Sequence, residues 1–115
     1  NQIRACVVEK GVFKIKLFLS WSWSIDTLAH FAVVWDKDGS NIGGGKTLLV
    51  KINNVEIGSS TITWGTTGTQ GSDLRIGISR EVPPFDPSKI VIDNLKTYNV
   101  CKINFSDRDI EAGYA

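Results

Sequence analysis

The sequence is short of several residue types that would indicate particular functions: it has no methionine, one histidine and two cysteines among 115 residues. Since translation starts with methionine, Asn1 is not expected to be the first residue translated, and we expect either a removed leader or a longer parent chain. The chain also lacks any apolar run close to the ~20 residues needed to cross a bilayer, so no membrane insertion is expected.

A surplus of one charge sign is also missing. The 13 basic and 12 acidic residues give a net charge of +1. A nucleic-acid-binding surface needs a basic stripe that neutralises phosphates, and the basic residues here are scattered among the acids. No nucleic-acid partner is therefore expected. The length allows one domain, residues 1–115, with a single core.

No group of residues is spaced for catalysis. The glutamates, Glu9, Glu56, Glu81 and Glu111, lie far apart in the sequence, whereas glycosidases use two carboxylates that flank the scissile bond. No nucleophile lies at a readable spacing from His30, so a packed or solvated histidine is favoured over a catalytic base. We expect no enzymatic activity and no cofactor, with calcium as the one alternative discussed below.

What the sequence does contain is a period-two alternation of apolar and polar residues, which is typical of strands. Residues 2–9 and residues 13–25 are the first two expected strands. The second is unusually long, so a bend or bulge near Ser20 is expected. Its apolar face would carry Phe13, Ile15, Leu17, Leu19, Trp21, Trp23 and Ile25.

Further strands are expected at residues 29–35, 47–52, 55–57, 61–64, 74–79 and 90–100. Residues 31–35 are apolar on both faces, as expected for a strand in the middle of two packed layers. Asn53 and Asn54 fit a type I′ turn, and a helical turn is expected from Ser106 to Gly113. The pattern predicts an all-β protein, an antiparallel two-sheet β-sandwich.

Four segments carry a resemblance to a known family. They are AHFAVVWD at residues 29–36, LLVKINNVEIG at 48–58, LRIGIS at 74–79 and VIDNLKTYN at 91–99. In this order and spacing they resemble the laminin-G-like branch of the concanavalin A-like jelly-roll domains. The resemblance implies a single jelly-roll domain with a binding function. Domains of that family are longer, so it also implies that this chain matches their C-terminal half to two-thirds. The remaining strands would then come from another segment or another chain.

Tryptophans are the residues that a sugar-binding site would use, since sugar rings stack on flat aromatic faces. The candidate ligand-binding residues are Trp64, Trp21 and Trp23. Trp64 stands at a strand end beside a glycine- and threonine-rich loop and is the best exposed candidate. Core burial is the favoured alternative for Trp21 and Trp23, which share one apolar face, and Trp35 is interpreted as core.

A metal site is an alternative for one turn. Asp36, Asp38 and Ser40 occupy alternate positions, as in the first half of a calcium-binding EF-hand loop. Thr47 stands where that loop needs a bidentate glutamate, so a solvated turn is favoured. Some laminin-G-like domains bind calcium at a loop rim, which keeps Asp36 and Asp38 as calcium candidates.

Two further features fit an extracellular or cell-surface location. Cys6 and Cys101 lie near opposite ends of the chain, and we favour a disulfide between them, with two buried free thiols as the alternative. Asn104, with Phe105 and Ser106, forms an N-glycosylation sequon.

Two functions from different classes remain open. The first is a non-catalytic extracellular binding or adhesion module for a carbohydrate or glycoprotein ligand. The second is a structural subunit that assembles into a surface layer or filament. In both cases we expect a homo-oligomer or contact with a neighbouring domain, because residues 13–25 would otherwise expose an apolar face.

Overall fold

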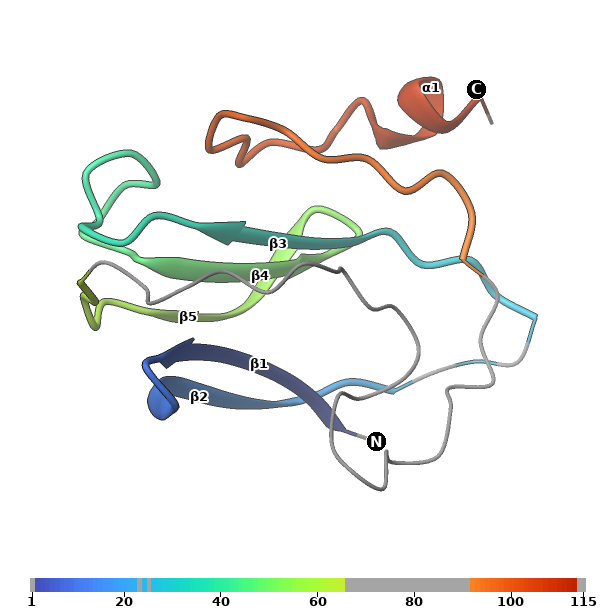
Figure 1. Ribbon diagram of the computed structural model, residues 1–115. Helices are drawn as coiled ribbons and strands as arrows, with labels where there is room; N and C mark the ends of the chain where they lie inside the picture. The colour runs from blue at the N-terminus through green and yellow to red at the C-terminus, as the bar shows by residue number, and fades with distance from the viewer. Residues whose placement is uncertain (1, 23, 25, 66–91, 114–115) are drawn as a thin grey trace.

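The computed structural model describes residues 2–22, 24, 26–65 and 92–113 (Figure 1). Within these residues it contains β1 (Gln2–Glu9), β2 (Val12–Ser20), β3 (Phe31–Trp35), β4 (Leu48–Ile52), β5 (Val55–Ser60) and α1 (Arg108–Ala112). The strands form two antiparallel sheets, one with the order β1-β2 and one with the order β3-β4-β5. The prediction of an all-β protein is confirmed at this level.

The described segments lie in three layers. In Figure 1 the β1-β2 sheet is at the bottom, the β3-β4-β5 sheet is in the middle, and residues 92–113 run across the top. One apolar cluster fills the space between the two sheets and consists of Ala5, Ile15, Leu48 and Val50, with partly buried neighbours. A second cluster, beneath the C-terminal segment, consists of Ala32, Val34, Ile42, Leu49 and Phe105.

The central strand of the larger sheet is β4, and the sequence pattern had indicated a different strand for this role. Val50 and Ile52 are fully buried, and Leu49 is buried on the opposite face. By contrast, β3 alternates between exposed and buried residues along its length. Trp35, interpreted from the sequence as core, is 65% exposed. An apolar run therefore does not by itself identify the strand that is covered on both faces.

The β1-β2 hairpin confirms the first expected strand and corrects the second. Ile15, Leu17 and Leu19 lie on the inner face as predicted. A bulge between Val7 and Val8, however, leaves Lys14 without a partner residue in the strand register and places Phe13 on the outer face, opposite Val8. The strand ends at Ser20, where a bend or bulge had been expected. The extra residue of a bulge reverses the alternation beyond it.

The turns follow the local sequence closely. Asn53 and Asn54 have φ values of 50° and 66°, as required for the predicted type I′ turn between β4 and β5. Lys10 and Gly11 also have positive φ values, 50° and 78°, at the tip of the first hairpin. Asparagine and glycine adopt this region more readily than other residues, so these reversals are set locally.

Two predicted strands are absent from the described part of the chain. Residues 61–64 and residues 92–100 have no strand pairing there. The expected strand at 74–79 lies outside the described residues, as do residues 90–91. The helical turn is confirmed, although Asp107 rather than Ser106 precedes it, without a side-chain cap. Gly113 ends the helix with a φ of 80°, as predicted. No helix in the described ranges has the length and apolar character of a membrane span.

The predicted disulfide between Cys6 and Cys101 is wrong in this structure, because both residues are free thiols. Cys6 is exposed on β1, whereas Cys101 packs against the cluster beneath the C-terminal segment. The β3-β4-β5 sheet lies between these two segments (Figure 1). Burial, with the nearby Asp36 carboxylate, raises the pKa of the Cys101 thiol. The two cysteines lie near opposite ends of the chain, and the fold does not bring them close enough in space to form a bond.

Candidate functional site

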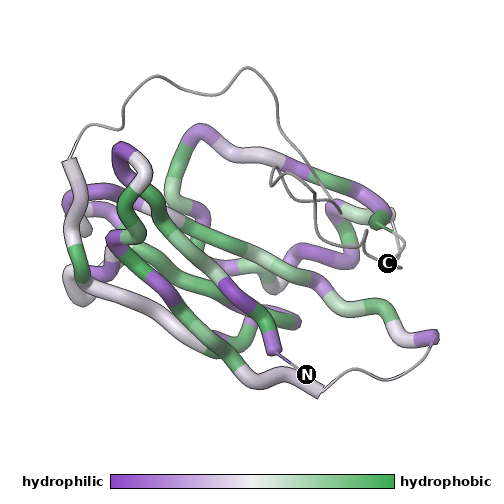
Figure 2. Tube along the Cα trace, turned by 60° about the horizontal axis from the view of Figure 1, so that its bottom comes forward, coloured by the Kyte–Doolittle hydropathy of each residue, from purple (hydrophilic) through white to green (hydrophobic). Residues whose placement is uncertain are grey.

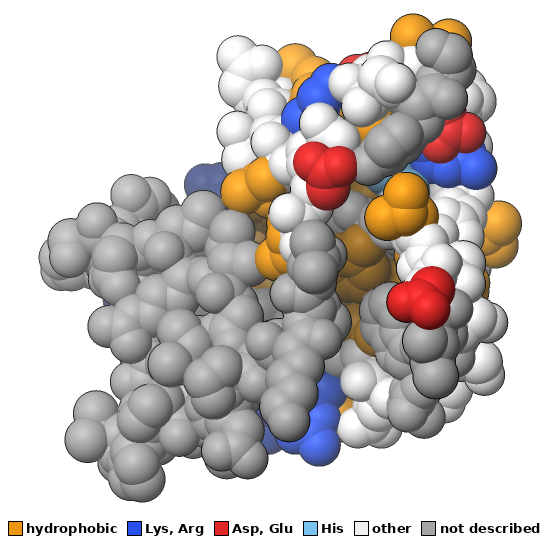
Figure 3. Space-filling model, turned by 90° about the vertical axis from the view of Figure 1, so that its right-hand side faces the viewer, with side chains coloured by type: hydrophobic (Ala, Val, Ile, Leu, Met, Phe, Trp, Pro, Cys, Tyr) orange, Lys and Arg blue, Asp and Glu red, His pale blue; other side chains and the backbone are white. Residues whose placement is uncertain are grey.

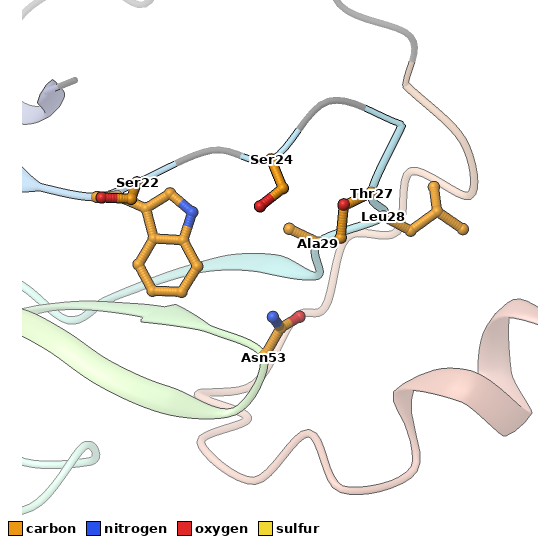
Figure 4. Close-up of a pocket in the computed structure, with 7 residues that line it drawn as sticks. Ser22, Ser24, Thr27, Leu28, Ala29 and Asn53 are labelled. Carbon is orange, nitrogen blue, oxygen red and sulfur yellow. The ribbon is translucent and has the colours of Figure 1, made fainter.

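A small pocket of about 110 Å³ lies where the chain leaves β2 and passes the β4-β5 turn (Figure 4). Its lining combines one aromatic ring with hydroxyl, amide and methyl groups. The residues are Trp21, Ser22, Ser24, Thr27, Leu28, Ala29 and Asn53. None of these side chains carries a charge.

The position of Asn53 follows from the type I′ turn that it begins. Its backbone N–H donates to the carbonyl oxygen of His30 at 2.8 Å. Its side-chain Oδ1 accepts from the backbone N–H of His30 at 2.9 Å. This pair of bonds fixes the loop of residues 21–30 to the turn and orients the asparagine amide. In Figure 4 the Asn53 and Ser24 side chains point towards each other across the pocket.

The lining of the pocket combines apolar and polar groups. Figure 3 looks at the side that lies to the right in Figure 1, where hydrophobic side chains lie among polar and acidic ones. Small-molecule sites have this character, with apolar walls and a few placed polar groups. The volume, about 110 Å³, lies below the roughly 300 Å³ at which pockets for drug-sized ligands begin. The pocket therefore suits a small ligand or one ring of a larger one.

Of the two predicted tryptophans that the structure describes, Trp21 and Trp64, one lines this pocket. Trp21 does, although core burial had been the favoured interpretation for it. Trp64, the predicted exposed candidate, instead packs partly buried against the cluster between the two sheets, and its backbone N–H donates to the Lys37 carbonyl at 3.3 Å. Trp23 lies outside the described residues. The structure thus reverses the predicted roles of Trp64 and Trp35.

The predicted calcium candidates lie in a loop that uses their carboxylates internally. Asp36 Oδ2 accepts from the backbone and side-chain nitrogens of Asn41, at 2.8 and 3.1 Å. Asp38 Oδ1 accepts from the backbone and the hydroxyl of Ser40, at 3.1 and 2.6 Å. The hydrogen bonds from Ser40 lower the pKa of Asp38. Within the described ranges no three His, Cys, Asp or Glu residues are grouped to hold a metal, and the geometry supports the interpretation as a turn.

His30 is packed, as the sequence had favoured. Its ring lies 5.1 Å from the ring of Phe105. Its Nδ1 atom is buried without a hydrogen-bond partner. Burial is the main reason that the pKa of His30 is lowered, with the nearby Arg108 as the next cause.

A polar network that the sequence did not indicate links residues within the C-terminal segment, residues 92–113, to one another. Lys102 Nζ binds Asp107 at 3.0 Å and Glu111 at 2.9 Å. Glu111 also accepts from the hydroxyl of Tyr98 at 2.7 Å. These bonds raise the pKa of Lys102 far above its usual value and lower those of both carboxylates. The residues are separated by up to 13 positions in the sequence, so no local pattern showed the network.

The sequon lies at the surface beside this network. Asn104 is exposed, and its Oδ1 accepts from the backbone N–H of Ser106 at 3.0 Å. Asn54 donates to the same oxygen at 3.4 Å. The asparagine that a glycan would modify is therefore accessible.

Sequence reasoning missed most of the pocket. Ser22 and Ser24 were placed on the polar face of a long strand, and the alternation did suggest that they are exposed. Nothing in the sequence indicated that Asn53 would lie near Trp21, because Trp21 follows β2 and Asn53 lies in the β4-β5 turn, far apart in the chain. Comparison of the chain with protein-family models, curated proteins and solved structures finds no match. The site therefore has to be interpreted from its own chemistry.

Proposed function

We propose that this chain is a non-catalytic carbohydrate-binding module of an extracellular or cell-surface protein, built as a laminin-G-like, concanavalin A-like jelly-roll sandwich. The observation that carries the proposal is the Trp21 pocket, in which an indole lies beside the side chains of Ser22, Ser24 and Asn53. The accessible Asn104 sequon supports the extracellular location.

The pocket chemistry matches a sugar ring. A pyranose presents C–H groups on its faces, which pack on an aromatic ring, and hydroxyls around its edge, which pair with serine hydroxyls and an asparagine amide. The small volume, about 110 Å³, indicates one ring. For a contact of this size we expect a dissociation constant on the order of 1 mM, which is about 4 kcal/mol of binding free energy.

The test is binding to a panel of immobilised, multivalent glycans, followed by NMR titration of the soluble protein with the best hit. Trp21→Ala should weaken binding by at least about tenfold, since it removes the stacking surface. Trp35→Ala is the matched control because Trp35 is an exposed tryptophan on β3 that does not line the pocket. Equal loss in both variants, or no glycan bound by the wild-type protein, would contradict the proposal.

Self-assembly is the second candidate, and exposed apolar residues on β3 favour it. The prediction that residues 13–25 expose an apolar face is partly corrected, because Ile15, Leu17 and Leu19 pack in the cluster between the sheets. Phe31 and Trp35 are exposed instead, and β3 pairs only with β4 among the described strands. Open apolar strand edges are prone to pair with other chains.

Mass in solution, measured by light scattering over a range of protein concentrations, separates the two functions. Assembly predicts oligomers that a charged substitution on β3, Val33→Lys, converts to monomers. A monomer that binds glycan through Trp21 would favour the binding module.

A further inference from the structure

The outer face of the β1-β2 hairpin differs from the rest of the surface. In Figure 1 this face is the underside of the lowest layer. Figure 2 brings that side forward and shows hydrophobic and hydrophilic residues along these strands. We define the hairpin outer face by cross-strand pairs with outward side chains: Gln2 and Ser20, Arg4 and Phe18, Cys6 and Lys16, and Val8 and Phe13.

Large apolar side chains of this face are open to solvent. Val8 is 45% exposed, Phe13 53% and Phe18 54%. Single exposed apolar residues are common on protein surfaces, but here three lie on one face of a small sheet, with Val8 paired to Phe13 and Phe18 beyond the Cys6–Lys16 pair. The bulge contributes directly, because it turns Phe13 away from the core and onto this face.

Positive charge is concentrated on the same hairpin. Its cationic residues are Arg4, Lys10, Lys14 and Lys16. Its one carboxylate, Glu9, has a side chain only 14% exposed and pairs with Lys14 at 3.6 Å. The whole chain carries a net charge of only +1, so the remainder of the chain is net negative. The hairpin outer face therefore combines cations with apolar side chains and carries no acid.

The cations and rings are in direct contact. The Arg4 guanidinium lies 5.3 Å from the centre of the Phe18 ring. Lys16 Nζ lies 4.4 Å from the centre of the Phe13 ring. Cation–π contacts of this kind cover the ring faces while the charges stay in water. Each cation is thus held next to an apolar group.

We propose that the hairpin outer face binds the surface of an anionic phospholipid membrane. Phe13, Phe18 and Val8 would enter the interfacial region, and Arg4 and Lys16 would contact lipid phosphates. Shallow burial of apolar groups together with attraction to anionic lipid is how peripheral proteins bind bilayers without spanning them. This site is distinct from the Trp21 pocket and does not depend on the carbohydrate proposal.

Other partners fit the same face less well. A second copy of the chain would bring two positive faces together, which is unfavourable. A soluble polyanion would neutralise Arg4 and Lys16 but would leave the apolar residues beside them in water. The anionic bilayer is the partner that satisfies both features of the face.

The test is co-sedimentation with phosphatidylcholine vesicles, with and without about 30% phosphatidylserine, at roughly 0.15 M salt. We expect binding only to the vesicles that contain phosphatidylserine. Arg4→Gln and Lys16→Gln should each weaken it about fivefold. Phe18→Ser should weaken it about tenfold, because an interfacial apolar contact is lost. Equal binding to both vesicle types, or no binding to either, would overturn the proposal.

Matched controls lie elsewhere on the surface. Lys37→Gln removes a cation from the β3-β4 loop, and Ile110→Ser removes an apolar side chain that is 72% exposed on α1. Neither should change vesicle binding. Soluble heparin provides the polyanion arm. Heparin binding that is lost in Arg4→Gln but unchanged in Phe18→Ser, without vesicle binding, would show a polyanion site and overturn the lipid proposal. Circular dichroism of every variant confirms folding.

Cys6 allows an independent measurement. It is an exposed thiol in the middle of the hairpin outer face and can carry an environment-sensitive fluorophore in a Cys101→Ala background. Its emission should shift to the blue with phosphatidylserine vesicles and stay unchanged with phosphatidylcholine alone. An unchanged emission in both cases would contradict contact through this face.

Discussion

The two faces of the β3-β4-β5 sheet are covered in different ways. On one face the β1-β2 sheet packs through aliphatic side chains, with Ile15 and Val50 fully or almost fully buried. On the other face the C-terminal segment contributes one large apolar anchor, Phe105, with Cys101 packed against the same cluster, and it also attaches through polar contacts. Lys51 Nζ donates to the Ile103 carbonyl at 2.6 Å, and Asn54 Oδ1 accepts from the Phe105 N–H at 2.8 Å.

The two faces should therefore differ in how much they stabilise the fold and in how strongly they respond to pH and salt. Aliphatic contacts are non-directional and independent of pH and salt. Each hydrogen bond or exposed ion pair contributes less to stability, and those that involve charged groups respond to pH and salt. We therefore expect the sheet-to-sheet interface to set the global stability and the C-terminal segment to open first.

The largest effects are expected from truncating the apolar anchor on each face. Ile15→Ala should lower the free energy of unfolding by about 3 kcal/mol, because it leaves a cavity between the sheets. Phe105→Ala should lower the local stability of the C-terminal segment by a similar amount. This segment should then be released while the two sheets stay folded. Denaturant unfolding together with hydrogen exchange of residues 101–113 separates the two outcomes. Global loss in both variants would contradict the comparison, and exposed Ile110→Ala is the control.

A smaller effect is expected at Gly58, where β5 lies close to a side chain of β2. A Cβ atom at Gly58 of β5 would overlap the side chain of Leu19 on β2. Gly58→Ala should therefore destabilise by about 1–2 kcal/mol, since the flexible Leu19 side chain can move only in part. Leu19→Val should recover some of this loss in the double variant. If the stability losses of Gly58→Ala and Leu19→Val simply add in a double-mutant cycle, Gly58 and Leu19 are not in tight contact.

The smallest effect concerns pH and the ion pairs within the C-terminal segment. The hydrogen bonds from Lys102 lower the pKa of Asp107 and of Glu111 below their ordinary values of 3.8 and 4.5. Their stabilisation is therefore present above those ordinary values and is lost as the pH falls through the lowered folded values. We expect the C-terminal segment to loosen in this acidic range while the sheets persist, as measured by NMR.

The variant Lys102→Met sharpens this prediction. It removes both ion pairs, so the segment should be looser at neutral pH and should show less additional loosening in acid. Lys46→Met breaks a comparable ion pair, with Glu56 at 2.6 Å, on a different part of the sheet. This control should leave the C-terminal segment unchanged. Acid loosening that persists undiminished in Lys102→Met would assign it to other groups.

His30 adds a separate pH range at the same interface. Because its pKa is lowered from 6.5, mainly by burial, the neutral ring is favoured in the folded state. Its contribution is present above pH 6.5 and is lost as the pH falls through the lowered folded value. This range begins at a higher pH than that of the carboxylates, because 6.5 is above their ordinary values of 3.8 and 4.5, so His30→Phe should remove the earliest stage of loosening.

The sequence alone was sufficient for features that depend on near neighbours. The pattern of apolar residues located β1, β3, β4, β5 and the start of β2 to within a few residues, since successive side chains of a strand point to opposite faces. Asn53 and Asn54 specified their turn because few residues adopt positive φ without strain. Gly113 ended the helix for the same reason. Each of these depends on backbone preferences within a few residues.

Only the tertiary structure decided which faces are covered. The bulge turned Phe13 outward, β3 came to the sheet edge with Trp35 exposed, and Trp64 was drawn between the sheets. Trp21, in the loop after β2, and Asn53, in the β4-β5 turn, came together to line one pocket. Alternation states that a side of a strand is apolar, but burial depends on what packs against that side. That packing is set by contacts between residues far apart in the chain, which no local pattern contains.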